Sequence, residues 1–233
     1  MTRHAAAAVA LLLLAACGGD SSSNELRGLS RPQRLQQLKK LVAENPGSKD
    51  LQQQLGDTAL EEGDAKAALA AFEKTGDAKG AAVARLWTDP AQFPTPQGSA
   101  QELYAAAMAT QLSVDSPFSV RANMLNQLNR AGRLFFEAGN MDAAGNCVQR
   151  AKPIVAVLLQ LPEPSLYAMH LAADYDNLYG DMLFRNHHWG NAREFFQNNV
   201  MRFRNWNPPN DYTKQRVEEA RRKVAECEKK MLP

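Results

Sequence analysis

The chain has 233 residues, of which 45% are hydrophobic and 22% are charged, and its net charge is +2. This length and hydrophobic content suffice for a folded domain with its own core, and the charged fraction is typical of a water-facing surface. The near-neutral charge disfavours nucleic acid as a partner, because binding to nucleic acid usually needs a strongly basic surface.

The N-terminus has the parts of a secretory signal: a basic start at Arg3, an apolar run over residues 5–16 and small residues at the cut. A spanning helix needs about 20 apolar residues, so this run is too short to be a permanent anchor. The sequence Leu14-Ala15-Ala16-Cys17 resembles the lipobox of bacterial lipoproteins. The resemblance implies a signal peptide over residues 1–16 and acylation of Cys17 on its sulfur and its new α-amine.

Residues 17–30 are predicted to form a flexible, lipid-anchored tether, because Asp20-Ser21-Ser22-Ser23-Asn24 is too polar to form a core. Gly18 and not an aspartate follows the cysteine. In a host with two membranes this resembles lipoproteins released to the outer membrane. The predicted location is therefore the cell envelope, facing the periplasm in such a host. The alternative is an ordinary secretory signal with a cysteine at the cut by chance.

Residues 31–233 are predicted to be all-α, because helical periodicity continues throughout and we find no strand pattern of any length. Ser99 and Glu102 have the spacing of a capping box. Ser116 stands before Pro117, as a cap before a first-turn proline. Three further residues stand where N-caps are expected, namely Ser48, Asp64 and Asn140.

Three segments share one spacing of small, bulky and turn residues. Each starts at a glycine (Gly56, Gly132 or Gly180), with further pattern residues at offsets +3, +7, +12 and +16. The +7 residues, expected in a turn between two helices, are Gly63, Gly139 and His187. This pattern resembles the tetratricopeptide repeat (TPR), a helix–turn–helix unit of about 34 residues. The resemblance implies a TPR-like solenoid of helical hairpins.

The spacing between the three segments is irregular. The first gap is predicted to hold a hairpin of residues 77–87 and 99–112 with a proline-rich loop between them. The second gap predicts lengthened helices, one of them kinked at Pro153. We therefore predict a divergent TPR-like solenoid, with a plain helical bundle as the alternative.

The end of the chain is predicted to be a capping helix from Asp211 onward that docks on the last repeat. Its apolar residues recur at heptad spacing, and they are Val217, Ala220, Val224, Cys227 and Met231.

Few side chains are suited to chemistry. His170 and Asp174 share a helical face and could hold a metal with a third ligand, but we see no H-E-x-x-H motif or Cys/His cluster. We interpret them as a helix-surface pair, and His187-His188 as polar turn residues. No nucleophile, phosphate-loop, dinucleotide or haem motif is present. We therefore predict no enzyme activity, no metal and no cofactor.

Two cysteines remain after Cys17, namely Cys147 and Cys227. We predict that they are buried free thiols. A disulfide between them is the alternative in an exported protein.

The repeat resemblance also implies a partner-binding face on the inner helices. The positions that it assigns to this face are Asp57, Asn126, Asn129, Arg133, Asp174, Asn177 and Asp181. All of them are polar, as expected of a concave peptide-binding face, and a merely solvated helix face is the alternative. The Asn123, Asn126 and Asn129 stripe is unusual, because surface helices more often carry Glu, Lys or Gln, which have higher helix propensity.

The function predicted from these features is a non-enzymatic, lipid-anchored adaptor or scaffold. It would bind another envelope protein and so assemble or stabilise a secretion, pilus or outer-membrane complex. One alternative is a structural subunit of a large envelope machine that uses its convex or terminal surfaces. Another is a small-molecule or glycan-binding enzyme built around His170 and Asp174.

Overall fold

The computed structural model describes Leu26, residues 28–161 and residues 164–232. The predicted signal peptide, Cys17 and most of the tether lie outside the described residues. Within them the chain forms α-helices and one short 3-10 helix, without a strand. The elements are α2 (Arg31–Glu44), α3 (Lys49–Glu62), α4 (Ala65–Thr75), α5 (Ala78–Leu86), η1 (Pro90–Gln92), α6 (Ala100–Ala109), α7 (Phe118–Glu137), α8 (Met141–Leu159), α9 (Leu166–Arg185), α10 (Trp189–Arg204) and α11 (Asp211–Met231).

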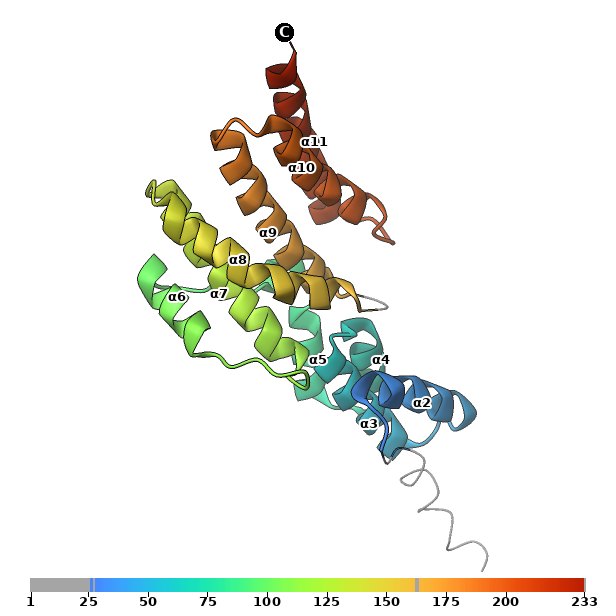
Figure 1. Cartoon of the computed structure of the whole chain (residues 1–233). Coiled ribbons are helices and arrows are strands. Elements are labelled where there is room, and N and C mark those ends of the chain that lie inside the picture. The colour runs from blue at the N-terminus through green and yellow to red at the C-terminus, as the bar shows by residue number, and fades with distance from the viewer. Residues whose placement is uncertain (1–25, 27, 162–163, 233) are drawn as a thin grey trace, which may run out of the picture.

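The helices form an extended stack that runs from α2 at one end to α11 at the other (Figure 1). Consecutive helices pack on one another along most of the chain, and α7 also packs on α9. The predicted all-α class with packed helical hairpins is therefore confirmed. One predicted hairpin is wrong: α6 packs on α7 and not on α5. The proline-rich loop is the physical reason, because prolines cannot continue either helix and the loop carries the chain across to α7.

Three of the hairpins share one turn. The predicted turn residues Gly63, Gly139 and His187 all have positive φ angles, of 84°, 80° and 61°. The residue after each donates its backbone N–H to the carbonyl five positions earlier, over 2.9, 2.8 and 2.9 Å. This bond satisfies a carbonyl that the end of a helix otherwise leaves unpaired. The same local geometry therefore ends α3, α7 and α9.

The first glycine of each pattern lies where another helix approaches closely. A Cβ atom on Gly56 would lie 2.5 Å from Phe72, and one on Gly180 would lie 2.6 Å from Phe196. These are contacts between the two helices of one hairpin. Gly132 differs, because its closest contact would be Leu178 of α9, at 2.6 Å. The central glycine therefore packs one hairpin against the next.

Four of the five predicted caps are confirmed, since Ser48, Asp64, Ser99 and Asn140 each accept a backbone N–H of the following turn. The prediction for Ser116 is wrong. The N-cap of α7 is Pro117, which makes no side-chain cap bond. The Ser116 hydroxyl instead accepts the backbone N–H of Ser113 over 2.8 Å, which closes a separate turn before the helix.

Helix α11 docks on α10, as predicted for a terminal cap. Val217, Ala220 and Cys227 are buried there, whereas Met231 near the end is exposed. The lengthened helices predicted for the second gap are also present, since α7 and α9 have 20 residues each. Helix α8 continues through Pro153 to Leu159. Among the described helices, none combines the length and apolar composition that crossing a membrane requires.

Candidate functional site

Helices α7, α9 and α11 line a polar cavity of about 460 Å³. The three helices are alternate members of the stack, so each presents one face to the same side, and α8 and α10 lie behind them. The loop at Pro94–Pro96 forms part of the wall. Asn126 ties this loop down by donating its side-chain amide to the Pro94 carbonyl over 2.7 Å.

Six of the seven residues assigned to a partner-binding face line this cavity. They are Asn126, Asn129, Arg133, Asp174, Asn177 and Asp181. The seventh, Asp57, is exposed on α3, where Gln53 donates to it over 3.4 Å. No residue of α3 lines the cavity. Between α3 and α7 the regular packing of consecutive helices is interrupted, because α6 packs on α7 and not on α5.

The asparagines of the cavity are buried and hold the helices together. Asn126 donates to the Tyr167 hydroxyl over 2.9 Å, and Asn129 donates to the Leu171 carbonyl over 2.8 Å. Both bonds join α7 to α9. The alternative of a solvated helix face is therefore wrong for Asn126 and Asn129, although Asn123 is exposed.

Ion pairs join the same three helices at two levels. At one level, Asp181 accepts from Arg133 of α7 over 2.7 Å and from Lys223 of α11 over 2.8 Å. At the other, Arg216 of α11 donates to Asp174 over 2.7 Å. These side chains are partly buried, so they are less screened than open surface pairs.

His170 lies at the cavity wall and not on an open helix surface. Its Nδ1 atom lies 2.7 Å from the Tyr212 hydroxyl, and its Nε2 atom lies 3.3 Å from an Asp174 oxygen. The Phe93 ring packs on it, with centroids 4.9 Å apart. Burial lowers the pKa of His170 although Asp174 opposes this shift, so burial favours the neutral imidazole. In the described part of the chain, no three His, Cys, Asp or Glu side chains are placed to share a metal ion.

Helix α11 contributes three side chains to the cavity that were not predicted from the sequence, namely Arg216, Glu219 and Lys223. Their spacing of three and four residues places them on one helical face. That face lies beside the apolar stripe by which α11 docks on α10. The alternating charges of α11 are visible in the sequence, but such a pattern is also typical of a solvated helix surface. Only the position of α9 opposite these charges makes them part of a cavity wall.

Two side-chain acceptors of the cavity have no hydrogen-bond partner. Asn129 and Asn177 are 6% and 7% exposed, and the Oδ1 atom of each is buried and unpaired. Buried polar atoms are nearly always paired, because an unpaired one costs about 1–3 kcal/mol. One N–H of the Asn129 amide donates to Leu171, and its Oδ1 atom has unused acceptor capacity. Both oxygens therefore have unused acceptor capacity at the cavity wall.

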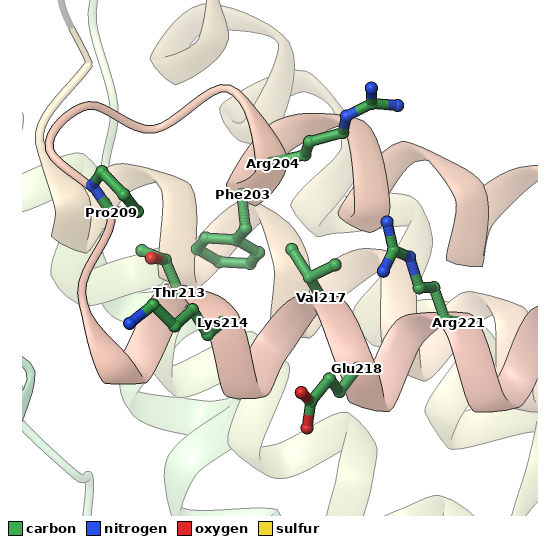
Figure 2. A pocket seen from close by; sticks show the side chains of 8 residues that line it. All are labelled: Phe203, Arg204, Pro209, Thr213, Lys214, Val217, Glu218 and Arg221. Carbon is green, nitrogen blue, oxygen red and sulfur yellow. The ribbon is translucent and has the colours of Figure 1, made fainter.

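A second, smaller cavity of about 220 Å³ lies between the end of α10 and the start of α11. Figure 2 shows Phe203 and Val217 facing each other within it. The charged side chains around this apolar floor are Arg204, Lys214, Glu218 and Arg221. Its rim is mainly basic, unlike the balanced charges of the first cavity.

The predicted free thiols are confirmed, since Cys147 and Cys227 are both unpaired and buried. Burial raises the pKa of Cys147 to about 11. Neither thiol lines either cavity. Both act as apolar core side chains in this fold.

Comparisons with protein-family models, with curated proteins and with solved structures give no match to this chain. Functional arguments therefore rest on the geometry of the cavity.

Proposed function

We propose that the protein is a non-enzymatic, lipid-anchored envelope adaptor. Its cavity between α7, α9 and α11 would bind a segment of another envelope protein and thereby help to assemble or stabilise a secretion, pilus or outer-membrane complex. The main support is that six residues assigned to a binding face line one cavity of about 460 Å³. The turn shared by three hairpins supports the view that they are divergent TPR-like units.

The anchor follows from the lipobox resemblance at Leu14–Cys17. Two or more acyl chains hold a protein stably on a membrane, whereas one is marginal. A tethered cavity meets its partner at a raised effective concentration, so weak contacts can suffice. We propose that Cys17→Ala releases the protein from the membrane fraction without changing its fold.

A direct test places a photo-crosslinking amino acid in the cavity wall in cells. Arg130 and Glu137 are suitable positions, because both line the cavity and both are exposed. Asn129 and Arg133 are unsuitable, because their side chains join α7 to α9. The matched control position is Gln149, which is exposed on α8.

We expect one protein to be crosslinked from positions 130 and 137 and not from 149. Absence of any such adduct, or equal yield from all three positions, would contradict the cavity as the docking surface. The adduct identified by mass spectrometry names the partner.

A structural subunit of a larger machine is the second candidate, and the apolar floor and basic rim of the smaller cavity favour it. Removing α11 would not be a clean test, because Val217 and Cys227 belong to the core. Arg204→Glu with Arg221→Glu reverses charges on the rim instead. Under this candidate the double variant loses assembly, whereas under the adaptor proposal it keeps the crosslinks from position 130.

An enzyme built around His170 and Asp174 is the least supported function. These residues make their hydrogen bonds and ion pairs to Tyr212 and Arg216, which leaves few free atoms for a substrate. Elemental analysis of the purified protein tests this candidate, since a stoichiometric metal would revive it.

A further inference from the structure

Helices α9 and α11 face each other in one constant register. His170 pairs with Tyr212, Asp174 with Arg216 and Asp181 with Lys223, and each pair is 42 positions apart in the sequence. In the two ion pairs, α9 supplies the carboxylate and α11 supplies the cation. The register thus forms a ladder of polar pairs along the cavity.

One level of this ladder has no hydrogen bond or ion pair across it. The same register places Glu219 of α11 opposite Asn177 of α9, and both residues line the cavity. The Asn177 Oδ1 atom is buried and has no partner. The nearest recorded contact of the Glu219 carboxylate is Arg216, at 3.9 Å, and Arg216 lies closer to Asp174. Asn177 and Glu219 thus make no bond to each other, whereas the neighbouring levels are joined by a hydrogen bond or an ion pair.

The third helix adds a further acceptor to this part of the cavity. Asn129 of α7 is also buried, and its Oδ1 atom is unpaired while its amide donates to Leu171 of α9. Asn129 Oδ1 and Asn177 Oδ1 thus receive no hydrogen bond, and Arg216 approaches the Glu219 carboxylate only to 3.9 Å. A protonated amine has three donors and no acceptor, and a guanidinium has five donors, so either group fits such a site.

The basic side chains of the cavity do not already fill this role. Arg216 is bound to Asp174 at 2.7 Å and lies 3.9 Å from Glu219, and Arg133 and Lys223 share Asp181. Arg130 is the remaining basic residue of the wall, and it is exposed without a recorded ion pair. Water screens its charge, so it opposes a bound cation only weakly.

We propose that this cavity binds a lysine or arginine side chain of the partner segment, with its donors directed to Asn129, Asn177 and Glu219. This inference rests on the proposed adaptor function and adds the chemistry of the residue recognised. The inference therefore predicts a lysine or arginine at one position of the partner's binding segment.

The test uses small probes and nuclear magnetic resonance of the purified, isotope-labelled protein. The probes are N-acetyl-lysine N-methylamide, its arginine counterpart, a neutral norleucine analogue, a glutamate analogue and spermidine. We expect the lysine and arginine probes to shift the side-chain amide signals of Asn129 and Asn177. The norleucine probe should bind at least about tenfold more weakly, because it lacks the charged donors.

The variant Glu219→Gln keeps the size of the side chain and removes its charge, so it should weaken the lysine probe about tenfold. Its matched control is Glu218→Gln, next in the chain but on the wall of the other cavity, which should leave binding unchanged. Arg130→Met should strengthen binding only slightly, because the charge that it removes is exposed and screened by water. Circular dichroism verifies that each variant is folded.

Equal binding of the norleucine probe, or tighter binding of the glutamate probe, would overturn the proposal. Spermidine binding tenfold more tightly than lysine would also overturn it, since the site would then serve a free polyamine. The crosslinking experiment keeps the two proposals separate. An adduct at position 130 without lysine binding refutes only this inference, and lysine binding without an adduct refutes only the adaptor function.

Discussion

Arg216 of α11 lies 2.7 Å from Asp174 of α9, and this ion pair shares its 42-residue separation with two other polar pairs. The C-terminal helix is thus more than a cover for the apolar end of the stack. Its apolar stripe packs on α10 while its charged face completes a cavity with α7 and α9. A terminal helix in this position both covers the core and supplies side chains to the cavity wall.

The first prediction concerns the close approach of α9 and α10 at Gly180. Gly180→Ala should destabilise the protein by about 1–3 kcal/mol, because overpacking forces a well-packed core to shift. The new methyl group would lie 2.6 Å from the Phe196 ring. Urea unfolding followed by circular dichroism measures the change. Gly145→Ala is the control, since its nearest atom would be 3.8 Å away, and it should be neutral or stabilising.

The second prediction concerns the buried ion pair between α9 and α10. Arg202 donates to Asp176 over 2.7 Å, and both side chains are almost fully buried. Arg202→Met should cost about 3–5 kcal/mol, because it leaves an unpaired carboxylate inside the protein. The control Arg204→Met removes an exposed charge and should change stability little. Adding Asp176→Asn should recover part of the loss.

The same pair predicts how the loss depends on pH. Burial raises the pKa of Asp176, and Arg202 opposes that shift. Removing Arg202 therefore raises the pKa further. In the folded variant the unpaired, charged Asp176 carboxylate is what lowers stability. The loss of stability is therefore present at neutral pH and becomes smaller as the carboxyl group is protonated. Unfolding free energies should show a larger loss for Arg202→Met at pH 8 than at pH 5; a pH-independent loss would contradict this.

The third prediction concerns His170, which faces Asp174 on its own helix and Arg216 and Tyr212 on α11. Its folded pKa is lowered by burial. Stability from the neutral imidazole is therefore present above its ordinary pKa of about 6.5 and is lost as the pH falls. His170→Gln should lose less stability than the unmodified protein between pH 7.5 and 5. Parallel losses in the two proteins would show that His170 does not carry the effect.

The fourth prediction concerns the left-handed turn residue His187, with a φ angle of 61°. His187→Gly should stabilise the protein by about 1 kcal/mol, because glycine adopts this conformation without the penalty of a Cβ atom. The neighbouring His188 has a φ angle of −87°, so His188→Gly should give no such gain. Thermal unfolding midpoints compare the two variants.

The fifth prediction counts thiols in the protein purified from membranes. Cys147 and Cys227 are buried, and the pKa of Cys147 is raised to about 11. A thiol-specific reagent should therefore react slowly with the folded protein, because the thiolate is the reactive form. In denaturant the proposed acylation predicts two reactive thiols, since a thioether on Cys17 would block the third. Three reactive thiols would contradict acylation of Cys17.

Local features of the structure were predictable from the sequence because they depend on neighbouring residues. The N-caps Ser48, Asp64, Ser99 and Asn140 each bond within one turn of their own position. The turns at Gly63, Gly139 and His187 likewise use only backbone groups within five residues. Ser116 was assigned wrongly because a competing local partner, Ser113, uses its hydroxyl.

The tertiary structure alone decided which helices meet, because those contacts join residues far apart in the chain. Nothing near residue 100 indicates that α6 packs on α7 and not on α5. The burial of Asn126 and Asn129 depends on Tyr167 and Leu171, about 40 positions away. The charged face of α11 becomes a cavity wall only when α9 lies opposite. Sequence periodicity defines the faces of each helix, but long-range packing determines what each face contacts.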